Sequence, residues 1–200
     1  MSSNEAMLKA TLRGEMRERV RALSSAARQR ESVQLCERLS KSAFWQAAKT
    51  VLFYAPLPDE PDVWPLLPAV HSAKRIVGLP RYAVEAGNYE ARQVRVIPAD
   101  LVTGKFGISE PGENCPRLDL SQVDLALVPG LAFDPSGGRL GRGRGFYDRL
   151  LAGFGGLKCG VAFDAQITAA VPMQTGDIRM DVVITPSRSW EQISRKGTPN

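Results

Sequence analysis

Two stretches of sequence decide the fold: Asp124-Leu125-Ala126-Leu127-Val128 and, shortly after it, Gly137-Gly138-Arg139-Leu140-Gly141-Arg142-Gly143-Arg144-Gly145-Phe146-Tyr147-Asp148-Arg149. The first is an unbroken apolar run, typical of a parallel strand that is buried on both faces. The second is a loop rich in glycine and arginine, and a helix is expected to follow it over residues 146–154. A strand, a loop and a helix in this order indicate an α/β domain, in which ligands bind outside the carboxyl ends of the strands.

The rest of the chain extends this alternation. Two helices are expected in the N-terminal third, because apolar residues recur at helical spacing from Leu12 to Leu23 and again, after a cap at Ser24 or Ser25, at Val33, Cys36 and Leu39. A further short helix is expected within 62–70, and strands over 51–54, 75–79, 90–96, 158–163 and 181–184. We therefore predict one α/β domain over residues 1–200: a mostly parallel sheet flanked by helices, an N-terminal helical pair, and a loose tail at 195–200.

Composition narrows the function. Hydrophobic residues make up 44% of the 200 residues and charged residues 24%, the mixture of a globular protein in water. No apolar run approaches the roughly 20 residues that span a bilayer, and residues 1–10 lack the apolar core of a secretory signal. We expect a cytoplasmic protein without a membrane partner.

A zinc site and a disulfide framework have little support. The cysteines, Cys36, Cys115 and Cys159, are odd in number and far apart, and His71 is the single histidine. This pattern argues against a zinc site or a disulfide framework, and favours cysteines that are small buried apolar residues.

Positive charge is concentrated in two places. The net charge is +5, which favours anionic partners such as nucleotides, polyglutamate or nucleic acid without choosing among them. Lys9, Arg13, Arg17 and Arg21 recur every four residues, so they share one face of the first helix. Such a face either binds an anion or is simply solvated.

The glycine–arginine loop suits a polyphosphate. Gly141, Gly143 and Gly145 allow a tight turn whose N–H groups can point at phosphate oxygens. The guanidinium groups of the loop match phosphate geometry, and Asp148 in the first turn of the helix is a candidate ligand for Mg²⁺. Neither a Walker A loop nor a dinucleotide fingerprint fits, since Gly-Lys-Ser/Thr is absent and Phe146 stands where the last glycine would be. A basic surface loop remains the alternative.

Residues 128–134 and 139–149 closely resemble the signature of the 5-formyltetrahydrofolate cyclo-ligase family, also called methenyltetrahydrofolate synthetase. The resemblance extends over nearly the whole chain, at Lys9 with Arg13, residues 54–60, 106–111 and 160–163, Gln166, Pro172, Asp177 and Asp181. It implies a NagB/RpiA/CoA transferase-like fold. It also implies an ATP-dependent enzyme that converts 5-formyltetrahydrofolate, possibly as its polyglutamate, to 5,10-methenyltetrahydrofolate with Mg²⁺ as cofactor, acting as a monomer.

The resemblance also assigns roles to residues. The ATP-binding set would be Lys9, Arg13, Arg139, Gly141, Arg142, Gly143, Arg144, Gly145, Phe146, Tyr147 and Asp148. The folate would contact Tyr54, Glu60, Phe106, Arg144, Gly145, Phe146 and Tyr147. The catalytic residues would be Arg144, Tyr147 and Lys9, and the metal-facing residues Asp148 and Asp181. Taken alone, Tyr54 suits a core better than a ligand site, and Tyr147 suits either. Glu60 could be a surface or helix-capping carboxylate, and Asp181 a carboxylate at a strand edge.

The sequence departs from the family pattern at several positions. Gly176 stands before Asp177, where the family commonly has His. Arg142 replaces a frequent aromatic residue between the first two glycines, Arg144 adds a charge in the same loop, and some relatives carry Trp where Phe106 stands.

Two other functions remain open from the residues themselves. One is a related α/β enzyme that binds a sugar phosphate in the same loop, since a fold does not settle a function. The other is a non-catalytic RNA-binding protein. It would need an aromatic-rich platform that this sequence lacks, so we expect no nucleic-acid partner.

Overall fold

The structure, a computed structural model, describes residues 3–192, so the expected tail at 195–200 lies outside the described residues. The helices are α1 (Ser3–Ala22), α2 (Ser25–Ser40), α3 (Ala43–Ala47), α4 (Leu67–Ser72) and α5 (Phe146–Leu150), with 3-10 turns η1 (Trp64–Leu66), η2 (Leu120–Gln122) and η3 (Asp164–Gln166). The strands are β1 (Thr50–Leu52), β2 (Ile76–Ala83), β3 (Asn88–Val94), β4 (Leu101–Thr103), β5 (Ser109–Pro111), β6 (Leu125–Val128), β7 (Ala132–Phe133), β8 (Arg139–Leu140), β9 (Leu157–Val161), β10 (Val182–Ile184) and β11 (Ser189–Glu191).

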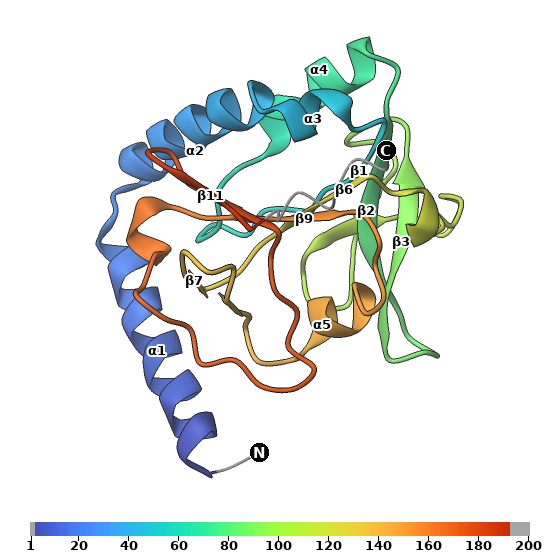
Figure 1. Cartoon of the computed structure of the whole chain (residues 1–200). Helices are drawn as coiled ribbons and strands as arrows, with labels where there is room; N and C mark the ends of the chain where they lie inside the picture. The colour runs from blue at the N-terminus through green and yellow to red at the C-terminus, as the bar shows by residue number, and fades with distance from the viewer. Residues whose placement is uncertain (1–2, 193–200) are drawn as a thin grey trace, which may run out of the picture.

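Within residues 3–192, seven strands form one sheet in the order β11-β10-β9-β6-β1-β2-β3 (Figure 1). Strands β10, β9, β6, β1 and β2 run parallel, and β3 and β11 add antiparallel edges. The predicted α/β fold with a mostly parallel sheet and an N-terminal pair of helices is thereby confirmed.

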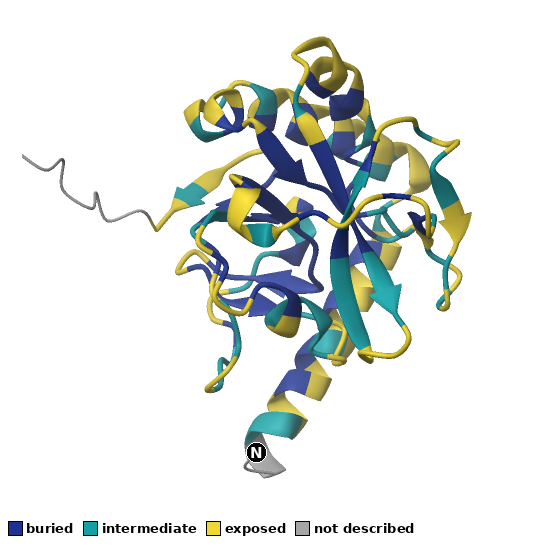
Figure 2. Ribbon diagram, turned by 90° about the vertical axis from the view of Figure 1, so that its right-hand side faces the viewer, coloured by how far each residue is buried: buried dark blue, intermediate teal, exposed yellow. Residues whose placement is uncertain are grey.

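The central strands are buried on both faces, because their side chains alternate between two cores. Leu125 and Leu127 of β6 join the core beneath α2, α3 and α4, whereas Ala126 and Val128 join the core beneath α5. Figure 2 shows these strands as the buried centre of the molecule. Burial on both faces explains why the sequence of β6 is unbroken in its apolar character.

The strand order reverses between β1 and β6. The connection from β1 to β2 passes through α4 on one face, and the connection from β6 to β9 passes through α5 on the other (Figure 1). Such a switch point leaves a crevice at the carboxyl ends of the two strands. The glycine–arginine loop follows β6 after a short segment that contains β7, and it lies at this crevice.

Several local predictions need correction. The last predicted helix stops at Leu150, because a turn at 151–153 precedes Gly155 and Gly156. Val33 was expected in the core but is 41% exposed. Leu35 lies in the core instead, beside Cys36 and Leu39. The short hairpins β4–β5 and β7–β8 and the edge strand β11 were not expected, since each has only two or three residues.

Two predictions about composition can be checked. Cys36, Cys115 and Cys159 are free thiols and all are buried, as expected for small apolar residues. Among residues 3–192, no helix combines the length and apolar character that crossing a membrane requires.

Candidate active site

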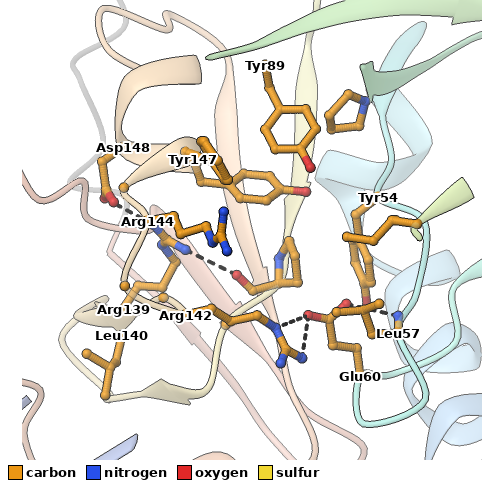
Figure 3. Close-up of a pocket in the computed structure, with 18 of the residues that line it drawn as sticks. Tyr54, Leu57, Glu60, Tyr89, Arg139, Leu140, Arg142, Arg144, Tyr147 and Asp148 are labelled. Atoms are coloured by element: carbon orange, nitrogen blue, oxygen red, sulfur yellow. Dashed lines mark hydrogen bonds and ion pairs between the residues drawn. The ribbon is translucent and has the colours of Figure 1, made fainter. Parts of the chain in front are cut away.

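A cavity of about 430 Å³ opens at the switch point, and we call it the cleft. Its walls come from α1, the segment after β1, strand β3, the β4–β5 hairpin, the loop after β8, α5 and the loop before β10. Figure 3 shows the side chains that converge there from segments far apart in the sequence.

The glycine–arginine loop is held by the β7–β8 hairpin and by Asp134. The Asp134 carboxylate accepts hydrogen bonds from the N–H groups of Ser136 (2.9 Å), Gly138 (2.9 Å) and Val171 (2.7 Å). Burial acts to raise the pKa of Asp134, but these hydrogen bonds outweigh it and the pKa is lowered. The carboxylate is therefore a charged anchor for the base of the loop.

Helix α1 supplies two cations to the cleft. Leu12 and Met16 pack the helix against the β7–β8 hairpin. This packing turns Lys9, which is 8% exposed, toward an ion pair with Asp177. It also lets Arg13 donate from Nε to the carbonyl oxygen of Gly141 at 3.0 Å. Lys9 and Arg13 thus line the cleft.

The other two cations of this helix face, Arg17 and Arg21, lie away from the cleft. Both side chains are exposed and neither lines the cavity. The four-residue spacing therefore marked one helix face correctly, but only its first two cations lie at the cavity.

Arg139 and Asp148 form the floor of the cleft at its cationic end. Arg139 is 6% exposed, and it donates to Asp148 Oδ1 at 3.0 Å and to the carbonyl of Pro129 at 3.2 Å. Asp148 Oδ1 also accepts from the N–H of Ile178 at 3.2 Å. This leaves Oδ2 of Asp148 without a partner among the described residues, and hence open to a cation.

Arg142 pairs with carboxylates on the opposite wall. It donates from Nη2 to Asp59 at 2.6 Å, and from Nε and Nη2 to Oε1 of Glu60 at 3.1 and 3.0 Å. Burial raises the pKa of Glu60 above its usual 4.5, and Arg142 opposes that rise. Burial acts to lower the pKa of Arg142, but Asp59 and Glu60 outweigh it and raise the pKa.

A cluster of aromatic rings forms the third wall. The rings of Tyr82, Tyr89, Phe106 and Phe146 meet mostly edge to face, with centroids 5.0 to 5.7 Å apart. The guanidinium of Arg144 lies 4.6 Å from the centre of the Phe106 ring. A planar heteroaromatic ligand would find apolar faces here and a cation at the edge.

The two predicted tyrosines lie in both the core and the cleft wall. Tyr54 is 1% exposed and its hydroxyl donates to the carbonyl of Pro61 at 2.6 Å. Tyr147 packs against both cores and also lines the cleft. Burial raises the pKa of both phenols well above the usual value, so both hydroxyls stay protonated. A core position and a position in the cleft wall, the two alternatives for these tyrosines, are therefore compatible.

Asp181 is the predicted site residue that the structure does not bring to the cleft. It precedes β10, and its Oδ2 accepts from the Lys158 N–H at 2.7 Å and pairs with Lys158 Nζ at 2.8 Å. Because β9 and β10 are parallel, these residues lie at the amino ends of their strands, whereas the cleft lies at the carboxyl ends. We therefore remove Asp181 from the expected metal site.

A metal ion in the cleft would need a bound substrate to supply most of the metal ligands. Within residues 3–192, no three His, Cys, Asp or Glu side chains gather closely enough to bind an ion by themselves. Asp148 and Asp177 both line the cleft on its cationic side. One or two carboxylates completed by phosphate oxygens and water suit Mg²⁺.

Three charged or aromatic residues that line the cleft were given no role from the sequence. Asp177 lay in a stretch already noted for its resemblance, so its signal was present. Glu110 also lay in such a stretch, residues 106–111, but was given no role. Tyr89 carried no such signal, because it reaches the cavity only through the pairing of β3 with β2. Glu110 is 3% exposed and accepts from the N–H of Tyr82 at 3.1 Å.

The fold and the cleft define an α/β protein with a cavity at the switch point of its sheet, lined by a glycine–arginine loop. A sequence model of the 5-formyltetrahydrofolate cyclo-ligase family matches residues 5–186, so the chain belongs to that family. The similar enzymes include the 5-formyltetrahydrofolate cyclo-ligase of Escherichia coli K12, 33% identical with 88% of this chain and 99% of the relative covered.

A further relative and a solved structure are also similar to this chain over most of its length. The 5-formyltetrahydrofolate cyclo-ligase of Mycolicibacterium smegmatis is 32% identical over 90% of this chain and 94% of its own. The NMR structure of Aquifex aeolicus 5,10-methenyltetrahydrofolate synthetase superimposes with a TM-score of 0.82 at 36% identity, covering 96% of both chains.

Proposed function

We propose that this chain converts 5-formyltetrahydrofolate to 5,10-methenyltetrahydrofolate, with ATP consumed to ADP and phosphate. One observation carries the proposal: a single cleft joins a cationic glycine loop at one end to a buried carboxylate and an aromatic wall at the other. The first end suits a triphosphate and the second a reduced pterin, which supports binding of both substrates in one cavity.

The nucleotide end comprises Lys9, Arg13, Arg139 and the N–H groups of the glycine loop. Gly143 and Gly145 have φ angles of +100° and +62°, a conformation that favours glycine and brings the backbone close to a ligand. Guanidinium groups and backbone N–H groups together match the oxygens of a polyphosphate.

The folate end comprises Tyr54, Glu60 and Phe106. The carboxylate of Glu60 accepts N–H groups of the pterin, and the rings of Tyr54 and Phe106 provide apolar contact. Tyr147 lies between the two ends, with a protonated hydroxyl available to the formyl group or to the phosphoryl group that is transferred.

In the proposed reaction the formyl oxygen attacks the γ-phosphorus, an O–P bond forms, and the bond to the β-phosphate oxygen breaks to release ADP. N10 then attacks the activated formyl carbon and loses its proton, and the carbon–oxygen bond breaks to release phosphate. The protein positions two substrates and stabilises charge, which is the main demand of phosphoryl transfer. We assign charge stabilisation at the γ-phosphate to Arg144 and Lys9.

Mg²⁺ would bind beside the phosphates at Asp148, whose Oδ2 has no partner among the described residues, with Asp177 as the neighbouring carboxylate. When bound, the ion would neutralise phosphate charge. The chain's own part is to place a carboxylate beside Arg139, so that cations and anions alternate along the nucleotide.

The test is direct. Purified protein is mixed with 5-formyltetrahydrofolate, ATP and Mg²⁺, and the absorbance of the methenyl product is followed with ADP release. One ADP for each methenyl product supports the proposal. Methenyl formation without ATP, or nucleotide binding without folate turnover, contradicts it. Action as a cytoplasmic monomer and use of polyglutamylated folate stay predictions, to be checked by fractionation, sedimentation and competition with glutamate-tailed substrates.

A further inference from the structure

The position of Arg142 does not match its expected role as a nucleotide ligand. Its guanidinium spans Asp59 and Glu60 on the folate wall, with N–O distances of 2.6 to 3.1 Å. Figure 3 shows the side chain directed toward Glu60 and away from Arg139 and Asp148. Arg142 thus belongs to the nucleotide loop by sequence but contacts the folate wall in space.

The contact occupies the carboxylate that a pterin needs. Oε1 of Glu60 accepts both bonds from Arg142, and Oε2 accepts the N–H of Leu57 at 3.1 Å. The Glu60 side chain is 6% exposed, so water does not replace these partners freely. A pterin N–H group must therefore share Oε1 with the guanidinium or displace it.

The same guanidinium belongs to the glycine–arginine loop, which we propose binds the phosphates. Arg142 lies between Gly141 and Gly143, and its side chain is 35% exposed, which leaves it room to change direction. Carboxylate pairs and phosphates both suit the planar fork of arginine. One guanidinium cannot give its full set of hydrogen bonds to both at once.

We propose that Arg142 couples the two substrates: the phosphates of the nucleotide draw its guanidinium from Glu60, and the released carboxylate then accepts the folate. The inference rests on the proposed function. Coupling between binding sites is reciprocal, so folate tightens nucleotide binding by the same factor. Couplings of this kind are typically on the order of 5- to 150-fold, and we expect about tenfold.

The experiment measures binding without turnover. The dissociation constant of 5-formyltetrahydrofolate is determined by calorimetry with and without the β,γ-imido analogue of ATP and Mg²⁺. In the unaltered protein the nucleotide analogue is expected to tighten folate binding about tenfold. In Arg142→Ala both ligands still bind, but the ratio of the two folate dissociation constants falls close to one.

Two further variants sharpen the result. Asp59 contacts Arg142 from outside the cleft lining. Asp59→Asn weakens the hold on Arg142, so it tightens nucleotide-free folate binding and reduces the ratio. Arg21→Ala removes an exposed arginine of α1 that does not line the cleft, and it keeps the ratio of the unaltered protein. Asp59→Asn decides the question if Arg142→Ala does not fold.

The possible failures are distinguishable. A ratio of one in the unaltered protein, or an unchanged ratio in both Arg142→Ala and Asp59→Asn, overturns the coupling while leaving the proposed reaction intact. Failure of the unaltered protein to bind either ligand, or to form the methenyl product, overturns the proposed function itself.

Discussion

Lys9 of the first helix and Asp177 of the loop before β10 form an ion pair at the cationic end of the cleft, although they lie 168 positions apart in the chain. Asp177 also accepts the N–H of Gln174 at 2.8 Å, so its carboxylate keeps one partner if Lys9 turns away. The pair places a buried ammonium beside the glycine loop, where a nucleotide phosphate would compete with Asp177 for it.

The first prediction concerns Lys9→Met, which removes the charge but keeps much of the aliphatic stem. A hydrogen bond to a charged group contributes about 1.5–3 kcal/mol, so we expect KM for ATP to rise roughly 10- to 100-fold. KM for folate should change much less. Arg17→Ala is the control, because Arg17 is an exposed residue of the same helix that does not line the cleft. An unaltered KM for ATP in Lys9→Met would exclude Lys9 from the nucleotide site.

The second prediction concerns Arg144→Ala. Arg144 is exposed and stacks on Phe106, a contact worth about 0.5–1 kcal/mol. The variant should therefore fold normally, while kcat falls on the order of a thousandfold because charge at the transferred phosphate is no longer stabilised. Steady-state kinetics and a thermal melt check both expectations.

Lys105→Ala provides the matched control for Arg144. Lys105 lies 5.8 Å from the centre of the same Phe106 ring but does not line the cleft. The kcat of Lys105→Ala should stay close to that of the unaltered protein. Equal losses in the two variants would mean that stacking on Phe106, and not the charge of Arg144, is what matters.

The third prediction concerns pH. Burial raises the pKa of Glu60 above 4.5, and the ionised form is the acceptor for the pterin. Folate binding is therefore complete above this raised pKa and is lost as the pH falls through it. The acid limb of kcat/KM for folate should lie at higher pH than an ordinary glutamate would give.

Glu60→Gln is the control for the acid limb. Glutamine does not titrate, so the variant should bind folate more weakly at all pH values and lack that limb. An acid limb at the same pH in Glu60→Gln would assign the titration to another group.

The fourth prediction concerns the metal. Chelation of Mg²⁺ should stop turnover, and added Mg²⁺ should restore it. Asp148→Asn should require several-fold more Mg²⁺ for half-maximal rate, because the neutral amide is a weaker ligand for a hard cation. Asp181→Asn should keep the Mg²⁺ dependence of the unaltered protein, since Asp181 pairs with Lys158 at the other end of the sheet. The reverse pattern would return Asp181 to the metal site.

Local sequence was sufficient for much of the architecture. The buried run of β6 and the capped helix α2, whose N-cap is Ser24, could be recognised because hydrophobic period and capping act over a few residues. The edge strand β11 and the short hairpins β4–β5 and β7–β8 could not be recognised, since each strand has only two or three residues. The helical stripe of α1 was visible as a pattern, but which of its cations reach the cleft depends on how Leu12 and Met16 pack.

The sequence by itself determined the α/β class, the family resemblance and most residues of the cleft, because these follow from residue type and short-range spacing. The tertiary structure alone decided that Asp181 lies at the wrong end of the sheet, that Asp177 faces Lys9, and that Arg142 contacts Glu60. The physical reason is strand direction and order: parallel strands bring their carboxyl ends to one edge, and chain distance says nothing about which residues meet there.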